Sequence, residues 1–408
     1  MTGNPSNVAL QDAIDAAASA PLSGAPHPVV THPVPKPASP AWWKRALWWI
    51  GRLIHDTFGL ASVIVLLAVL AAIPLLNFAA LGYLLAAEGR IARGGRLREG
   101  LPLSAIAPRL GSIALGLWLW TLPLRFIAGA VADAELIAQG GPSHQRLEML
   151  QMVLWAAISL HLVLAIARGG SLTCFIRPIK NARWLWKRLR SGSYWTRAGE
   201  LVNEFLEPLK FGRHWWLGVR GFVVASAWLL IPSALLAALR KLEPGPGLVT
   251  IAGGLLLIWV FSWIPFLQAR FAAEQHLRSG FQLKTVRELW RHAPIAWLSV
   301  CVVIYVLSLP LYLFKVALPP DDAIWFITLI FIASILPTRI LTGWAYRRAA
   351  RKQADGRRAH FLVRLGCRLL LLPLLGLYVF LLFFTQFIDE HGKQALFEHH
   401  AFLLPWPG

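Results

Sequence analysis

The sequence predicts an all-α, polytopic α-helical membrane protein with about eight transmembrane helices. The 408-residue chain is 57% hydrophobic and 15% charged, whereas soluble proteins carry about 25% charged residues. Its mean hydropathy is +0.56. Long apolar runs and an uneven distribution of Lys and Arg support the same fold class.

Eight apolar runs are long enough to cross a bilayer, for which roughly 20 apolar residues are needed. None has the alternating pattern of a membrane β-barrel, so each run predicts a helix. The runs cover residues 58–80, 110–130, 149–167, 221–239, 247–267, 293–314, 322–341 and 366–386.

Lys and Arg alternate between rich and poor connections. The connections after the first, third, fifth and seventh spans carry five, eleven, five and seven basic residues, with Arg339 counted in the last. The intervening ones carry two, two and one. Since basic loops stay in the cytoplasm, the rich connections are expected there and the C-terminus outside. The net charge of +20 is therefore a topology signal, and no nucleic-acid partner is expected.

Two features of the sequence disagree about the side of the membrane on which the N-terminus lies. Residues 1–40 predict a disordered tail rich in Pro, Ala and Ser, and 41–56 an interfacial segment of Trp and basic residues. Eight spans place the N-terminus outside, but Lys44, Arg45 and Arg52 favour the cytoplasm. The apolar run is also broken at Ile73-Pro74. It is either one kinked span, which we favour, or a re-entrant hairpin that leaves seven spans.

The remaining chain divides into four predicted parts. Two transmembrane units, 57–167 and 221–388, flank a cytoplasmic amphipathic connection, 168–220, and an external tail, 389–408, follows. In the connection, apolar Leu201, Val202, Phe205, Leu206 and Leu209 share one helical face. This pattern favours helices along the cytoplasmic membrane surface, which could contact protein partners and anionic lipid.

A motif in the first unit has a counterpart in the second. AAEGRIARG at 86–94 aligns without gaps to AAEQHLRSG at 272–280, each preceded by Ile-Pro and followed by a span with Leu-Pro. This spacing favours a parallel internal duplication; the alternative is that membrane helices commonly end in small and basic residues. The letters IARGG recur at 166–170, where glycine is expected to end a helix.

Residues 73–124 resemble a known family. GYLLAAEGRIARGGRLREGLPL, with Gly82-Tyr83, Gly94 or Gly95 and Leu101-Pro102, is similar to the domain of unknown function 4013. This is a family of bacterial and archaeal polytopic membrane proteins. The resemblance implies an integral membrane protein and no assigned activity.

Polar residues in or near the spans are the candidate functional residues, because such groups are costly there. Glu88 and Glu274 are expected at cytoplasmic edges, with Glu88 paired to Arg90 or Arg93. His161 is expected to bond a neighbouring helix's backbone rather than relay protons.

Two further polar residues lie beside prolines. Arg125 is expected at a membrane edge, although a central position could bind an anion. Asn77, next to Pro74, is expected to satisfy freed backbone groups, although it could instead mark a binding site in a broken helix.

No cofactor or metal site is expected. Cys174, Cys301 and Cys367 are far apart and lack ligand spacing. The tail contains three His and three acidic residues in no metal-specific pattern: Asp389, Glu390, His391, Glu398, His399 and His400. No catalytic motif occurs.

These observations favour a non-enzymatic scaffold or envelope-organising protein of the bacterial inner membrane, with a basic cytoplasmic face that binds anionic lipid headgroups. The alternative is a permease or channel for a small or lipidic solute. That alternative predicts a cavity near Asn77, His161 and the prolines at 123 and 310.

Overall fold

A computed structural model describes most of the chain after residue 41. The described residues are 42–95, 100–103, 106–192, 195–196, 199–200, 203–204, 207–238, 244–316, 324–387, 392–399 and 402–403. The chain divides into two compact units, residues 1–51 and 52–408.

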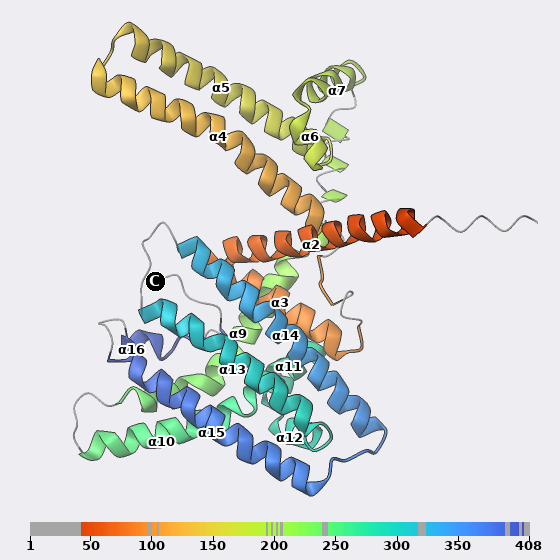
Figure 1. The fold of residues 1–408 in the computed structure, drawn as a ribbon, viewed down its shortest axis with the longest axis vertical. Helices are drawn as coiled ribbons and strands as arrows, with labels where there is room; N and C mark the ends of the chain where they lie inside the picture. The colour runs from red at the N-terminus through yellow and green to blue at the C-terminus, as the bar shows by residue number, and fades with distance from the viewer. Residues whose placement is uncertain are drawn as a thin grey trace, which may run out of the picture. The chain divides into compact units, whose positions relative to one another are not determined.

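All regular structure in the described residues is helical (Figure 1). Six helices are long and apolar enough to cross a membrane, and two bent helix pairs raise the number of candidate spans to eight. The chain is therefore a polytopic all-α membrane protein. Six long helices are α2 (Trp42–Ala72), α4 (Ala107–Ile137), α5 (Pro142–Ala167), α9 (Phe211–Leu236), α14 (Ile324–Ala354) and α15 (Phe361–Thr385). The bent pairs are α10 (Pro244–Phe261) with α11 (Ile264–Glu274), and α12 (Leu283–Trp290) with α13 (Pro294–Val316).

The first apolar run differs from the kinked span predicted at 58–80. Helix α2 ends at Ala72, and a separate helix, α3 (Asn77–Ala92), begins after Leu76. Pro74 lies in the break, where it has no backbone N–H to continue a helix, and Leu75 adopts a positive φ of 67°. The seven later predicted spans each correspond to a helix or a bent pair.

Helix α3 is almost completely enclosed. Fourteen of its sixteen residues are buried, because it packs against α9, α11 and α14. At 1.5 Å per residue it is about 24 Å long, which is shorter than the roughly 30 Å hydrocarbon core. Its apolar surface is therefore covered by neighbouring helices, and GYLLAAEG, expected at the end of a span, lies within the protein core.

The repeated IARGG motif ends two helices in the same way. In the first copy, Gly94 N–H donates to the Ile91 carbonyl and Gly95 N–H to that of Arg90. In the second, Gly169 and Gly170 bond the carbonyls of Ile166 and Ala165. Gly94 and Gly169 have φ values of 120° and 127°, a conformation that glycine adopts without steric penalty. The prediction that this motif terminates helices is confirmed.

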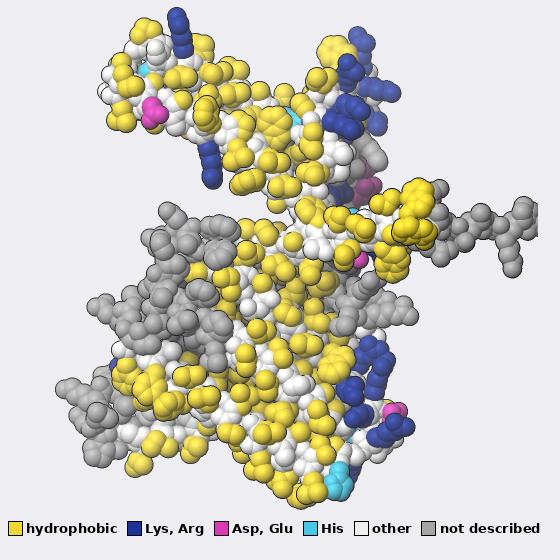
Figure 2. All heavy atoms as spheres, in the orientation of Figure 1, with side chains coloured by type: hydrophobic (Ala, Val, Ile, Leu, Met, Phe, Trp, Pro, Cys, Tyr) yellow, Lys and Arg dark blue, Asp and Glu magenta, His cyan; other side chains and the backbone are white. Residues whose placement is uncertain are grey.

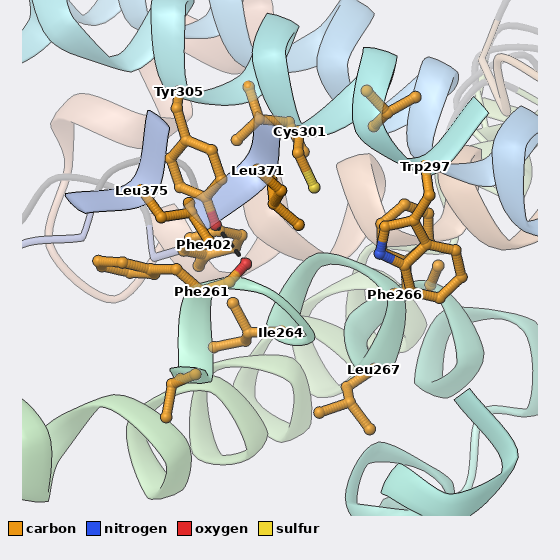
Figure 3. Packing of buried hydrophobic residues seen from close by; sticks show 14 of the residues in the cluster. Phe261, Ile264, Phe266, Leu267, Trp297, Cys301, Tyr305, Leu371, Leu375 and Phe402 are labelled. Atoms are coloured by element: carbon orange, nitrogen blue, oxygen red, sulfur yellow. Dashed lines mark hydrogen bonds between the residues drawn. The ribbon is translucent and has the colours of Figure 1, made fainter. Parts of the chain in front are cut away.

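An aromatic core joins α10, α11, α13 and α15. The Tyr305 hydroxyl donates to the Phe261 carbonyl, which is freed where α10 ends, at an O···O distance of 2.6 Å. Phe266 stacks on Trp297, and Phe402 packs near Phe261 (Figure 3). This core therefore also includes a residue that follows the last span.

The segment after α5 forms α6 (Leu172–Ile176) and the amphipathic α7 (Pro178–Arg190). These elements pack against α5 around a small cluster that includes Cys174 and Phe175. A short 3-10 helix, η1 (Glu207–Leu209), precedes α9, and two more short elements are η2 (Leu277–Phe281) and α16 (Gly392–Ala395). Of the amphipathic pattern predicted at 201–209, residues 201–202 and 205–206 lie outside the described residues.

Hydrophobic side chains cover most of the visible protein surface, while Lys and Arg gather in clusters, one of them over α7 (Figure 2). Examples of exposed hydrophobic side chains are Trp118 and Phe126 on α4 and Trp155 on α5. An exposed apolar surface of this extent suits a lipid environment.

Close approach between α3 and α9 generates the first prediction. A Cβ on Gly82 would overlap the backbone carbonyl of His214, so we expect Gly82→Ala to destabilise the protein by about 1–3 kcal/mol through overpacking. Gly129→Ala on α4, which has no atom within 4 Å of the added Cβ, is the matched control. Unfolding in detergent measures both variants; an unchanged Gly82→Ala would contradict this packing.

Candidate functional site

An ion pair lies at the centre of the helix bundle. Arg339, at the middle of α14, donates from Nη1 to Glu88 Oε2 on α3 at 3.0 Å. Side-chain exposure is 4% for Arg339 and 0% for Glu88. An enclosed charge is stable only when an opposite charge and further hydrogen bonds compensate it. The arrangement around Arg339 supplies both.

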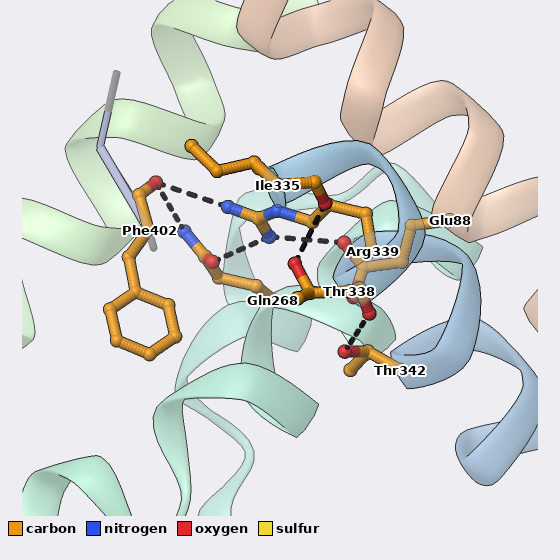
Figure 4. Close-up of polar contacts among 7 residues, drawn as sticks. All are labelled: Glu88, Gln268, Ile335, Thr338, Arg339, Thr342 and Phe402. Carbon is orange, nitrogen blue, oxygen red and sulfur yellow. Dashed lines mark hydrogen bonds and ion pairs between the residues drawn. The ribbon is translucent and has the colours of Figure 1, made fainter. Parts of the chain in front are cut away.

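Arg339 binds three segments at once (Figure 4). Besides Glu88, its Nη1 donates to Gln268 Oε1 on α11 at 2.7 Å, and its Nη2 to the Phe402 carbonyl at 3.2 Å. Gln268 Nε2 donates to the same carbonyl at 3.3 Å. We call Glu88, Gln268, Arg339 and the Phe402 carbonyl the polar core.

The polar core corrects two predictions. Glu88 does not pair with Arg90 or Arg93 at a membrane edge, because α3 lies inside the bundle with Glu88 directed towards α14. Arg339 is not part of a cytoplasmic connection, because α14 continues to Ala354. Among the described residues, Glu88 Oε1 has no hydrogen-bond partner. Local sequence spacing could not reveal a pair whose members are 251 residues apart.

A cavity of about 220 Å³ lies beside the polar core. Helices α3 and α9 form two sides, and the segment after α16 forms a third. Leu403 lines the cavity, while the preceding Phe402 carbonyl bonds Arg339. The lining residues are Asn77, Phe78, Leu81, Phe222, Ser226, Leu229, Leu230, Ser233, Phe397, Glu398, His399 and Leu403.

Asn77 lies at the cavity with an uncompensated acceptor. The residue is 4% exposed, and its Oδ1 has no hydrogen-bond partner in the described part of the chain. The prediction that Asn77 satisfies freed backbone groups near Pro74 is therefore wrong for this oxygen. Its position at the start of α3, after the break, directs it into the cavity instead.

The segment after the last span closes one side of the cavity. His399 is 2% exposed, and its Nε2 lies 2.7 Å from Ser233 Oγ on α9. In the sequence, His399 is one of six His and acidic residues of the tail that form no metal-specific pattern. The buried Phe402 and Leu403 were the available signal, since an apolar pair after a polar stretch suits a segment that returns to the core.

His161 belongs to a separate network. Its Nε2 lies 2.9 Å from the Phe175 carbonyl, so it carries the proton, and Nδ1 accepts from Asn181 Nδ2 at 3.4 Å. Trp120 Nε1 donates to the same carbonyl at 2.9 Å. The predicted bond from His161 to neighbouring backbone is confirmed, and His161 does not line the cavity.

The other two predicted residues lie outside the cavity. Arg125 is exposed on α4, and its expected position at a membrane edge stays a prediction. Glu274, the last residue of α11, pairs with Arg270 at 2.8 Å and is 38% exposed. The glutamates of the two proposed repeats thus occupy different environments: Glu88 is enclosed, whereas Glu274 lies at a rim. The duplication remains a prediction.

Metal ligands do not converge in the described residues, where no group of three or more His, Cys, Asp and Glu could hold a metal ion. Asp389, Glu390, His391 and His400 of the tail lie outside those residues. The polar core and the cavity together offer hydrogen-bonding and charged groups beside an apolar space.

The polar core generates the second prediction. We expect Glu88→Ala to lower the free energy of unfolding by about 3–5 kcal/mol, because it leaves Arg339 enclosed without its counter-charge. Glu88→Gln keeps an acceptor and should have a smaller effect. The control, Glu274→Ala, removes an exposed pair of about 0.2–1 kcal/mol. Equal effects of Glu88→Ala and Glu274→Ala on unfolding in detergent would contradict the enclosed pair.

Comparisons of the chain with protein-family models, curated proteins and solved structures found no match. The resemblance of residues 73–124 to the domain of unknown function 4013 stays a prediction. The cavity and the polar core are accordingly the basis for the functional argument.

Proposed function

We propose that the protein binds a small lipidic solute inside its helix bundle and acts as a permease for it in a bacterial inner membrane. The observation that carries this proposal is the cavity with the uncompensated Asn77 Oδ1. An enclosed acceptor without a partner is destabilising by about 1–3 kcal/mol. A bound molecule that donates a hydrogen bond would remove that penalty.

The cavity walls suit an apolar molecule. Phe78, Leu81, Phe222 and Leu229 supply apolar surface, and the volume exceeds the roughly 150 Å³ that suffices for benzene in an engineered cavity. Leu230 is 58% exposed at the cavity. Since exposed apolar residues of a spanning helix face lipid, a molecule could enter from the bilayer.

The contacts of the polar core allow the segment after α16 to move. Ionisable pairs within membranes commonly mark functional sites, and Arg339 holds the segment that closes the cavity. Displacement of that segment would leave Arg339 with Glu88 and Gln268 as compensating partners. A rearrangement of the cavity wall therefore need not expose an unpaired charge.

A matched pair of substitutions tests the permease. Ser226→Trp fills the cavity, whereas Ser299→Trp adds the same side chain at an exposed position on α13. In proteoliposomes, we expect the native protein and Ser299→Trp to accelerate transbilayer movement of a short-chain fluorescent lipid. Ser226→Trp should reduce movement to that of protein-free liposomes; equal rates in both variants would contradict the proposal.

A second candidate is a scaffold with a basic face that binds anionic lipid, which α7 favours. Ile179, Trp186 and Leu189 are exposed on one helical face, while Lys180, Arg183 and Lys187 share another. A helix with these two faces suits the surface of an anionic bilayer. A protein partner that binds within residues 168–220 would contact this same surface of α7.

Charge removal from α7 tests the second candidate. Each basic residue near an anionic surface contributes about 1 kcal/mol, so replacing Lys180, Arg183 and Lys187 by Gln should markedly reduce retention of phosphatidylglycerol. Native mass spectrometry measures the lipid that remains bound. The same replacement at Arg348, Arg351 and Lys352 of α14 is the control; equal losses would contradict a specific role of α7.

A further inference from the structure

The two AAE segments aligned in the sequence contact each other in the fold. A Cβ on Gly89, in the first segment, would overlap the Ala272 carbonyl in the second, so α3 and α11 approach closely there. Arg93, which follows α3, donates from Nη1 to the Ala272 and Ala273 carbonyls at 3.2 and 2.7 Å. These carbonyls belong to the last turn of α11, where carbonyl groups lack partners within the helix and attract cations.

Two arginines of α9 contact the residue that follows α11. Arg213 Nη2 donates to Gln275 Oε1 at 3.2 Å, and Arg220 Nη1 donates to the Gln275 carbonyl at 2.9 Å. Gln275 has a φ of 58°, which is uncommon for a residue with a side chain. Glycine would adopt this backbone more readily, so the bond to Arg213 gives a reason for a side chain here. Arginines from two directions therefore meet around the end of α11.

Arg90 adds a fourth positive charge to this group. It lies one turn before Arg93 and is exposed. Burial, followed by the positive charges of Arg213 and Arg90, lowers the pKa of the Arg93 guanidinium. The guanidinium groups are thus close enough to repel one another, and an anion placed between them would compensate that repulsion. We call Arg90, Arg93, Arg213 and Arg220 the arginine cluster.

Positive charge exceeds negative charge in both stretches of sequence that supply the cluster. Residues 89–106 contain four Arg and one Glu, and residues 207–220 contain three basic residues and one Glu. Both stretches are therefore net positive, whichever partner each Glu takes. Glu274, at the end of α11, pairs with Arg270, which is outside the cluster. The charge of the cluster thus suits an anionic ligand.

From these features we propose that the arginine cluster binds a phosphate monoester. Such a group carries about 1.5 to 2 negative charges at neutral pH and has three oxygens that accept hydrogen bonds. A guanidinium can donate two parallel N–H bonds to phosphate. Arg93 and Arg213 each use one terminal nitrogen for their bonds to the end of α11, so the other can donate to a ligand. A phosphodiester, with one charge, compensates the cluster less completely.

The phosphate can belong to a lipid headgroup or to a soluble molecule. Arg90 and Arg213 are both exposed, so either source can reach them. Phe211 and Trp216, which flank Arg213 on α9, are also exposed, and aromatic residues beside basic ones suit the headgroup depth of a bilayer. None of the four arginines is among the described residues that line the cavity, so this site is separate from the proposed permease path.

The test compares headgroups on identical acyl chains. The native protein in detergent receives dioleoyl phosphatidic acid, phosphatidylglycerol or phosphatidylcholine, and native mass spectrometry measures the lipid that stays bound. We expect phosphatidic acid, a monoester, to bind about tenfold more tightly than phosphatidylglycerol, a diester, because it carries more negative charge. Equilibrium dialysis with radiolabelled inorganic phosphate tests the soluble source: saturable binding identifies a soluble ligand, and its absence beside retained phosphatidic acid identifies the lipid.

A double variant locates the site. Arg90→Gln with Arg213→Gln should weaken binding of phosphatidic acid about thirtyfold, and it spares Arg93 and Arg220, which hold the end of α11. The matched control removes two charges from α7, as Lys180→Gln with Arg183→Gln. It should keep the preference for phosphatidic acid over phosphatidylglycerol, even where total retention of anionic lipid falls.

Two results would overturn the proposal. In the first, the native protein retains phosphatidic acid no better than phosphatidylglycerol and binds no inorganic phosphate. In the second, the variant of the arginine cluster keeps the full preference for the monoester. The first comparison uses the native chain, so a variant that fails to fold does not prevent the test. Neither result bears on the cavity or on movement of a lipidic solute through it.

Discussion

The guanidinium of Arg339 is the group on which the arrangement of the bundle depends. It contacts Glu88 from α3, Gln268 from α11 and the Phe402 carbonyl from the segment after the last span. Each partner comes from a different part of the chain. A single enclosed cation therefore joins four segments. Moving α3 would remove its counter-charge, whereas moving the Phe402 segment would remove one hydrogen-bond acceptor and keep Glu88 in place.

The same geometry connects stability with the cavity. Phe402 bonds Arg339 through its carbonyl, while the adjacent Leu403 and the nearby His399 line the cavity. Asn77, at the other end of α3 from Glu88, also lines it. The cavity is thus framed by elements that the polar core holds in place. On one side of the cavity, α3 is joined to α14 by the ion pair, and on another side lies the short segment after α16.

Composition and periodicity were sufficient to predict the fold class and the approximate positions of most apolar helices along the chain. The length of an apolar run and the positions of Lys and Arg around it are properties of a single helix, so each helix can be predicted separately. The IARGG caps can also be predicted, because they depend on contacts within five residues. The partner of Glu88 could not be predicted this way, because it depends on tertiary packing of α3. Arg339 was misplaced for a related reason: a basic residue near the expected end of a span looks like a loop residue. Asn77 was identified as a candidate, but its cavity is formed by residues that follow the last span.

The 251-residue separation between Glu88 and Arg339 has a consequence for biogenesis. At synthesis rates of about 5–20 residues per second, the ribosome needs roughly 10–50 seconds to reach the arginine after completing the glutamate. Helix α3, too short to span the bilayer on its own, must meanwhile remain in the translocon, at the membrane surface or beside an insertion chaperone. Membrane integration of this chain is therefore expected to be non-sequential, with an early segment entering its final position after later ones.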